Sequence, residues 1–300
     1  MRGGPHLRVA QKPAILLAVA AAALYGLSAP VSKLLLGSVG ATMLAALLYL
    51  GAGAGLLAVR LAQRALGAAT REAPLTRRDL PATVAMVALD IAAPVLLMAG
   101  LQRTSAANAA LLNNFEIVAT SVIALIAFRE AVSRRLWAAI ALVTAASALL
   151  SVEGADSLRF SMGSLLVLLA CVCWGFENNC TRVLSDKDPL EIVVVKGFGS
   201  GGGALLIAFA AGERLPAAGP LLLALLLGFV AYGLSIFCYI RAQRALGAAK
   251  TSAWYALAPF IGTGLSLVLL NEPPAAFFPA ALVLMGAGAY LAATDRPAGD

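Results

Sequence analysis

Residues 41–61 read ATMLAALLYLGAGAGLLAVRL, with one charged side chain, Arg60, next to the end. An α-helix rises about 1.5 Å per residue, so about 20 apolar residues cross the roughly 30 Å hydrocarbon core of a bilayer. The stretch therefore predicts a transmembrane helix. Its glycines, Gly51, Gly53 and Gly55, predict close packing against another helix, because small residues let helix backbones approach in lipid.

The rest of the 300 residues has the same character. Hydrophobic residues make up 61% and charged residues 12% of the chain, whereas a soluble domain carries about 25% charged residues. The alternation of every second residue that is typical of barrel strands is absent. The sequence predicts an all-α integral membrane protein with ten transmembrane helices: Ala14–Leu36, Ala41–Leu61, Leu80–Leu101, Thr104–Phe128, Leu136–Val152, Met162–Leu184, Pro189–Ala211, Pro220–Ile240, Leu246–Leu270 and Ala275–Thr294.

The N-terminal segment has two interpretations. Arg2, Arg8 and Lys12 precede the apolar stretch Ala14–Leu24, as in the front half of a secretory signal. The apolar pattern continues to Leu36, however, which is long enough to span a membrane. We expect a first transmembrane helix that is retained.

Lys and Arg concentrate on one side of the predicted helices. Of the 22 in the chain, 17 fall in the two terminal segments and the alternate loops that share their side. The opposite loops hold Arg103, Arg159 and Arg214, and Lys33 and Lys196 lie within predicted helices. Because Lys and Arg favour cytoplasmic loops, both termini are predicted to lie in the cytoplasm, with the chain in the plasma (inner) membrane.

Several classes of protein are excluded or disfavoured. The net charge of +7 does not indicate a nucleic-acid partner, because the basic residues lie in short loops and not on one water-exposed face. His6 is the only histidine and no Gly-Lys-Ser/Thr triplet occurs, so neither a metal or other cofactor nor a Walker-type ATPase is predicted. The cysteines lie inside apolar segments, which favours packing roles and leaves pairing open: Cys171, Cys173, Cys180 and Cys238.

Three matches indicate an internal repeat. Residues 25–35, YGLSAPVSKLL, align with residues 174–184, WGFENNCTRVL. The other matches are glycines 51, 53 and 55 with glycines 199, 201 and 203, and Ala106-Ala107 and Glu130 with Ala248-Ala249 and Glu272. Five helices per copy is an odd number, so the second copy is expected to be inverted in the membrane. We predict two five-helix units, residues 14–152 and 160–294, an architecture typical of secondary transporters.

Over about residues 14–294 the sequence resembles the EamA-type members of the drug/metabolite transporter superfamily. The resemblance rests on the aromatic-Gly pairs at 25–26 and 174–175, each followed by Ser/Thr-Lys/Arg, and on small-residue-rich helices four and nine. Those two helices end in Arg129-Glu130 and in residues 271–274, NEPP. Within the superfamily the chain is most similar to amino-acid exporters of the YddG type. The resemblance implies export of small metabolites and places helices one, four, six and nine around a central cavity.

One position departs from the family pattern. Helix nine carries Pro259, but Ile117 occupies the matching position in helix four. We therefore expect the two halves to bend unequally. The prolines within predicted helices are candidate bending points: Pro30, Pro94 and Pro259.

Ionisable residues inside membrane helices are costly and hence candidates for function. Asp90 and Glu116 lie in the middle of helices three and four, where either could carry a proton. Glu177 and Lys196 lie roughly 10 Å from the cytoplasmic ends of helices six and seven. We expect them to form an ion pair or to face the cavity together, the alternative being a bridge that only holds helices together. Lys33, near the outer end of helix one, is expected to extend to water.

Polar and aromatic residues on helices one, four, six and nine form the candidate substrate lining. Amide and hydroxyl groups can bind the ammonium and carboxylate of an amino acid, and aromatic faces accept its side chain or a cation. The alternative is that the aromatic residues anchor at membrane interfaces or fill the core. The candidates are Tyr25, Ser28, Asn113, Asn114, Trp174, Glu177, Asn178, Trp254 and Tyr255, with Tyr232 and Tyr239 as weaker ones.

The sequence thus predicts a secondary transporter, not an enzyme, that exports small metabolites by alternating access. Neutral or aromatic amino acids are the expected substrates, and drugs, nucleosides or other metabolites are the alternatives. A membrane-embedded transferase would need clustered carboxylates or a histidine near a membrane face, which this sequence lacks. A channel would show neither saturation nor counterflow. The expected partners are the lipid bilayer and a small-molecule substrate, with no nucleic acid or ATPase subunit.

Overall fold

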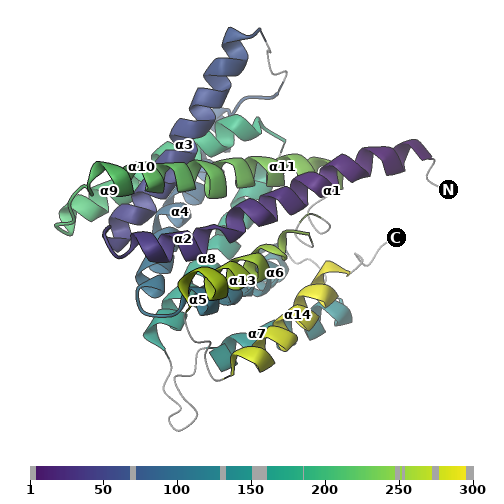
Figure 1. Cartoon of the computed structure of the whole chain (residues 1–300). Helices are drawn as coiled ribbons and strands as arrows, with labels where there is room; N and C mark the ends of the chain where they lie inside the picture. The colour runs from purple at the N-terminus through teal and green to yellow at the C-terminus, as the bar shows by residue number, and fades with distance from the viewer. Residues whose placement is uncertain are drawn as a thin grey trace.

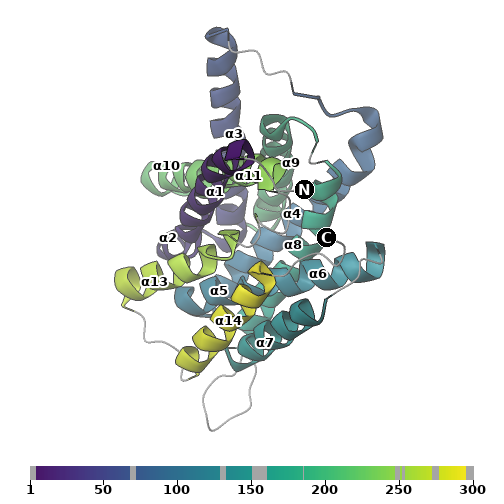
Figure 2. The ribbon, with the colours of Figure 1, turned by 90° about the vertical axis from the view of Figure 1, so that its right-hand side faces the viewer.

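The computed structural model consists of packed helices (Figures 1 and 2). Within the part of the chain that it describes, the regular elements are helical, with one isolated parallel β-bridge between Ala73 and Lys187. The described residues are 5–67, 72–128, 133–150, 161–184, 186–246, 251, 254–271 and 277–294.

Helices occupy all ten predicted segments. The first half contains α1 (Pro5–Gly26), α2 (Ser28–Leu35), α3 (Ala41–Ala65), the short 3-10 helix η1 (Arg77–Asp79), α4 (Leu80–Leu101), α5 (Ala106–Leu112), α6 (Phe115–Phe128) and α7 (Arg134–Leu150). The second half contains α8 (Met162–Val183), α9 (Pro189–Ala210), α10 (Ala218–Leu227), the π-helix η2 (Gly228–Leu234), α11 (Ser235–Leu246), α13 (Ala258–Leu270) and α14 (Phe278–Ala293). Parts of predicted segments five, nine and ten lie outside the described residues.

Six described helical stretches are long and apolar enough to cross a membrane, judged by length and composition. They are Pro13–Leu35, Ala41–Ala65, Arg77–Leu101, Met162–Val183, Pro189–Ala210 and Ala218–Ala242. Ala258–Leu270 and Phe278–Leu291 are shorter apolar helices. The described part of the chain is therefore helical, with several candidate membrane spans.

Three predicted helices are interrupted. The first breaks at Leu27, between α1 and α2, and the fourth breaks at Asn113 and Asn114, between α5 and α6. The ninth turns at Ala256 and Leu257 before α13. At the offset that pairs Ala106 with Ala248, Asn114 pairs with Ala256, so helices four and nine break at matching positions.

Helix four is therefore interrupted as well, although Ile117 stands where helix nine has Pro259. The expected unequal bending of the two halves stays a prediction. Two adjacent asparagines favour a break in helix four, because asparagine has a low helix propensity. At this break the backbone hydrogen bonds join residues three apart, as in a 3-10 turn. Glu116 N donates to Asn113 O at 3.1 Å, and Ile117 N donates to Asn114 O at 3.1 Å.

α3 and α9 cross at the centre of the molecule through their glycines. A Cβ on Gly53 would lie 3.0 Å from the backbone nitrogen of Phe198, and a Cβ on Gly201 would lie 2.7 Å from that of Leu50. Since residue numbers rise along α3 as they fall along α9, the two helices run antiparallel. The matching segments two and seven thus form one pair across the crossing.

The other helix pairs follow the same scheme. α4 packs against α8, and α1 packs against α11, which are segments three with six and one with eight. α5 packs against α13 and α7 against α14, two pairs that also lie side by side in Figures 1 and 2. Each half of the chain therefore contributes one member to every one of these pairs.

Lys33 differs from its expected role. Its Nζ donates hydrogen bonds to Leu101 O and Thr104 O, both at 2.6 Å. These carbonyls lie at and just beyond the C-terminal end of α4, where backbone acceptors lack helical partners and a cation is favoured. Lys33 thus ties α2 to the end of α4, where the sequence suggested a side chain extended to water.

Candidate substrate cavity and buried charge cluster

A small cavity of about 10 Å³ lies where the three interrupted helices meet. That volume has room for about one water molecule, which is too little for an amino acid. Interrupted helices leave backbone N–H and C=O groups without helical partners near the break. The cavity is lined by Tyr25, Gly26, Ser28, Ala29, Ala110, Asn113, Ala258, Pro259 and Gly262.

A group of tyrosines adjoins this cavity. The ring of Tyr25 lies 5.7 Å from the rings of both Tyr232 and Tyr255, measured between centroids, and Tyr239 lies 5.0 Å from Tyr255. These distances are typical of favourable aromatic pairs. Ser28 Oγ donates a hydrogen bond to the hydroxyl of Tyr232 at 3.0 Å. The structure therefore gives Tyr232 a more central place than the sequence indicated.

The π-helical segment η2 places Tyr232 there. A π-helix is rare, appears as single-turn insertions and occurs frequently at functional sites. Tyr232 is fully buried on this segment. The hydrophobic periodicity of the sequence carries no signal for an i to i+5 turn, so the position was not predictable from spacing.

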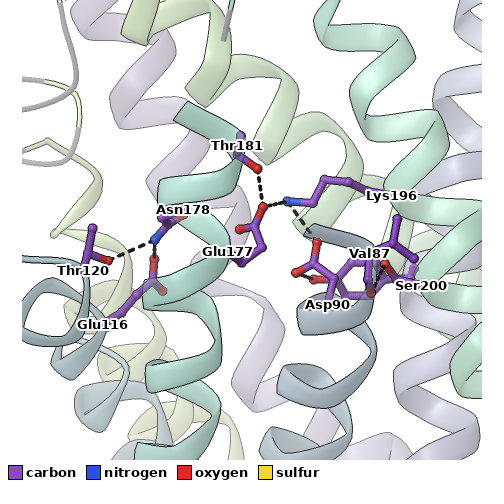
Figure 3. A network of polar contacts seen from close by, with 10 residues as sticks. Val87, Asp90, Glu116, Thr120, Glu177, Asn178, Thr181, Lys196 and Ser200 are labelled. Carbon is purple, nitrogen blue, oxygen red and sulfur yellow. Dashed lines mark hydrogen bonds and ion pairs between the residues drawn. The ribbon is translucent and has the colours of Figure 1, made fainter. Parts of the chain in front are cut away.

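Three charged side chains from three helices form a buried cluster (Figure 3). Lys196 Nζ of α9 lies 2.9 Å from Glu177 Oε1 of α8 and 3.1 Å from Asp90 Oδ2 of α4. All three side chains are at most 5% exposed. The ion pair expected between Glu177 and Lys196 is thus present, and Asp90 joins it; what the cluster does in transport stays a prediction.

Glu116 belongs to a separate group (Figure 3). Its Oε1 accepts a hydrogen bond of 2.6 Å from Asn178 Nδ2, which also lies 3.3 Å from Thr120 Oγ1. Glu116 begins α6 directly after the break, where a negative side chain is favoured by the helix dipole. The predicted residues Glu116 and Asn178 therefore contact each other and not Asp90.

Tyr49, which the sequence reasoning missed, connects the charge cluster to the tyrosines. Its hydroxyl donates to Asp90 Oδ1 at 2.9 Å, and its ring lies 5.4 Å from that of Tyr232. Through Tyr232 and Ser28 the contacts continue to the cavity. Tyr49 sits among the apolar residues of α3 and resembles an ordinary core side chain in sequence.

The remaining predicted residues are distributed unevenly. Asn114 is 1% exposed, and neither its Nδ2 nor its Oδ1 has a hydrogen-bond partner. Trp174 is buried, whereas Trp254 is 40% exposed and is not among the residues that line the cavity. The structure therefore brings Tyr25, Ser28 and Asn113 together at the cavity and sets Trp254 apart.

One end of the helix bundle is closed by contacts between residues 73–79 and 187–191, which we name the 73–191 latch. Asp188 N donates to Ala73 O at 2.9 Å, and Leu75 N donates to Glu191 Oε2 at 3.2 Å. Two ion pairs add to it, Lys187 with Asp79 at 3.1 Å and Arg60 with Asp188 at 3.6 Å. Asp188 also caps α9, since its Oδ1 accepts from Leu190 N at 2.9 Å.

Another contact, the Glu213 latch, joins the loop after α9 to the first turn of α3. Glu213 accepts hydrogen bonds from Thr42 N at 3.2 Å and from Met43 N at 2.6 Å. A carboxylate at a helix N-terminus satisfies free donors and complements the helix dipole. α3 and α9 are therefore held to each other at both of their ends.

The described residues contain no group of three or more His, Cys, Asp or Glu side chains that could hold a metal ion. All four cysteines are free thiols, so the possibility of pairing that the sequence left open is not realised.

Comparisons with known proteins agree with the fold. The EamA-like transporter family matches the chain twice, over residues 12–152 and 161–294. A protein of Methanothermobacter thermautotrophicus (strain ATCC 29096 / DSM 1053 / JCM 10044 / NBRC 100330 / Delta H) described as an uncharacterized transporter is 28% identical over 275 residues, 85% of this chain and 78% of its own length. A solved crystal structure with 18% identity superposes with a TM-score of 0.68, covering 94% of this chain and 96% of its own, which shows likeness of fold.

The two family matches cover most of the chain, and together with the relative described as a transporter they indicate a transporter rather than an enzyme. Together with the candidate spans they describe a multi-pass membrane transporter. This chain belongs to the EamA-like transporter family.

Proposed function

We propose that the protein is a secondary transporter that exports small metabolites, with neutral or aromatic amino acids as the first substrate class. The observation that carries this proposal is the meeting of three interrupted helices at one cavity. In secondary transporters, discontinuous helices near the membrane centre supply the backbone groups that bind substrate.

The helix ends at the breaks offer both partial positive and partial negative charge to a substrate. α2, α6 and α13 begin at the breaks, so their N-termini supply N–H donors and positive dipole ends that suit a carboxylate. α1 and α5 end there, so their carbonyls suit an ammonium group. An amino acid carries both charges on one carbon. The tyrosines beside the cavity suit an apolar or aromatic side chain.

The proposed substrate-contacting side chains extend this set. Asn114 has two buried polar atoms without partners, a condition that is rare in folded proteins and suits a residue that awaits a ligand. Trp254 would join only after a rearrangement, because it is 40% exposed and does not line the cavity in this state. The full proposed set remains Tyr25, Ser28, Asn113, Asn114, Trp174, Glu177, Asn178, Trp254 and Tyr255.

We propose two inverted repeats, residues 14–152 and 160–294, with ten membrane spans. The antiparallel crossing of α3 and α9 supports inversion, because helices two and seven of a parallel repeat would run the same way. The N-terminal end of α1 and the C-terminal end of α14 lie on the same side of the molecule (Figure 1), which fits two cytoplasmic termini in the plasma membrane.

Alternating access then corresponds to opening one latch at a time. The cavity is too small for a substrate in this state, so the protein must open to load it. With the termini in the cytoplasm, the 73–191 latch closes the cytoplasmic end and the Glu213 latch closes the outer end. No ATPase subunit is needed for this cycle.

Counterflow in proteoliposomes tests the proposal. Vesicles loaded with unlabelled L-leucine, L-phenylalanine or L-tryptophan should accumulate the labelled form of the same amino acid transiently and with saturation. A channel would equilibrate the label without an overshoot. If folded protein exchanges no amino acid, the amino-acid assignment is wrong, and drugs, nucleosides and sugar derivatives become the candidates within the same family.

A further inference from the structure

The Asp90–Glu177–Lys196 cluster has more negative than positive groups. Two carboxylates share one ammonium, and the side chains come from α4, α8 and α9. When all three are ionised, the cluster carries one uncompensated negative charge. Such a charge is costly away from water, so the cluster favours uptake of one positive charge.

The two oxygens of Asp90 differ in their contacts. Oδ1 accepts a hydrogen bond from Tyr49 at 2.9 Å. Oδ2 lies 3.1 Å from Lys196 Nζ, and the same ammonium also donates to Glu177 Oε1, which accepts from Thr181 as well. Asp90 is fully buried, so among the described residues the only cation that compensates its charge is an ammonium that it shares with a second carboxylate.

We propose that Asp90 is the proton-binding site of this transporter and that Tyr49 is the positioning residue that links its protonation to the substrate cavity. The proposal rests on the transport function proposed above and names its driving ion. Because Asp90 shares Lys196 with Glu177, a proton on Oδ2 removes the negative charge that the single ammonium leaves uncompensated. The titratable side chains that face Asp90 are Tyr49 from α3, Glu177 from α8 and Lys196 from α9.

One transport cycle takes up one proton at Asp90 and releases it again. A proton from the aqueous phase forms an O–H bond with Oδ2, which makes Asp90 neutral while Lys196 keeps its bond to Glu177. The reverse step returns the proton to water on the other side of the membrane. One proton is taken up and one is released, and no other bond is formed or broken.

Tyr49 provides the link because it touches both sites. Its hydroxyl bonds to Asp90, and its ring packs against Tyr232, whose hydroxyl accepts from Ser28 at the cavity wall. A substrate that engages Ser28 changes the contact at Tyr232, and a proton on Asp90 changes the bond at Tyr49. By thermodynamic linkage, substrate binding and proton binding then change each other's affinity by the same factor.

Infrared spectroscopy tests the proton site without any substrate. The purified full-length protein should show a protonated-carboxyl band as the pH falls, and Asp90→Asn should lose the component that belongs to this residue. Asp186→Asn, an exposed loop position, serves as the matched control and should keep the wild-type spectrum. Tyr49→Phe should change the pH at which the band appears. A spectrum that is the same in wild type and Asp90→Asn would overturn the assignment.

Flux measurements test the link. Proteoliposomes under an imposed pH gradient should accumulate labelled L-leucine, and Tyr49→Phe should reduce that accumulation about tenfold, within the roughly 5–150-fold range of typical couplings. Energy-independent leucine counterflow should remain in the same variant. Tyr290→Phe makes the same chemical change at an exposed site and should behave as wild type.

The outcomes separate the two proposals. Full gradient-driven accumulation by Tyr49→Phe would overturn the link, and accumulation driven by a sodium gradient but not by a pH gradient would overturn proton coupling. If wild-type protein exchanges no leucine at all, the amino-acid assignment fails, while the infrared titration still decides whether Asp90 binds a proton.

Discussion

Gly53 and Gly197 meet where α3 and α9 cross. A Cβ on Gly53 would lie 3.1 Å from Cα of Gly197, and a Cβ on Gly197 would lie 2.8 Å from the carbonyl oxygen of Tyr49. The crossing therefore fixes the position of Tyr49, and with it the contact to Asp90. Packing between the two halves of the chain and the geometry of the charge cluster depend on the same pair of glycines.

This relationship gives the first prediction. Gly197→Ala should destabilise the protein by about 1–3 kcal/mol, because the new Cβ would meet backbone atoms of Gly53 and Tyr49, which cannot move aside like a flexible side chain. Gly202→Ala on the same helix is the matched control, since a Cβ there would meet no atom within 4 Å. The midpoint of thermal unfolding in detergent measures both, and equal midpoints for the two variants would show that the crossing is not tight.

Asn114 and Asn108 give a paired test of the substrate site. Asn108 Nδ2 donates to Leu150 O at 3.1 Å, whereas the side chain of Asn114 has no partner. Asn108→Ala should therefore cost about 1 kcal/mol more stability than Asn114→Ala, the usual net worth of one hydrogen bond. Counterflow should fall only in Asn114→Ala. Loss of transport in neither variant would remove Asn114 from the proposed site.

Much of the fold was predictable because lipid imposes strong rules on sequence. Every predicted apolar segment contains a helix, and the charges within them had to find partners, as Glu177 and Lys196 do. The pairing with Asp90 was less accessible, because which faces of α4 and α9 meet is decided by tertiary packing and not by spacing along the chain.

Other parts of the site left weak signals or none. The asparagine pair at 113–114 does signal the break in helix four, but only if the low helix propensity of asparagine is weighed against the apolar pattern around it. Tyr49 and Tyr232 look like core residues, and the π-helical turn that positions Tyr232 leaves the apolar pattern unchanged. Aromatic residues in a membrane helix gain their role from what they face.

We expect the loss of Lys196 from the charge cluster to cost far more stability than the loss of Lys187 from the 73–191 latch. Lys196→Met leaves two buried carboxylates without their cation and should cost about 3–5 kcal/mol. Lys187→Met removes a partly exposed ion pair and should cost at most about 1 kcal/mol. Unfolding midpoints in detergent measure both; similar losses would mean that water reaches the cluster.

The double variant Glu177→Gln/Lys196→Met extends this test to function. It removes one charge of each sign, so it should be more stable than Lys196→Met alone. Gradient-driven transport should still be lost if the cluster couples the proton, because Asp90 then lacks the charged neighbours that it has here. Normal gradient-driven transport by a folded double variant would mean that the cluster only holds helices together.

The two latches predict opposite shifts in access to the cavity. Glu213→Ala removes the acceptor from Thr42 N and Met43 N, and Asp188→Ala removes the cap of α9 and the pair with Arg60. Each loss is worth about 1 kcal/mol, or roughly a fivefold change in the closed population at that end. A cysteine at position 29, in a background without the four native cysteines, reports access because Ala29 lines the cavity.

Labelling with a membrane-impermeant thiol reagent then separates the two ends. Glu213→Ala should speed labelling about fivefold from outside, and Asp188→Ala should speed it from the cytoplasmic side, by the same estimate. Arg214→Ala, an exposed neighbour of Glu213, controls for a general effect of altering that loop and should leave both rates unchanged. If either latch variant raised labelling equally from both sides, the two ends would not open in alternation.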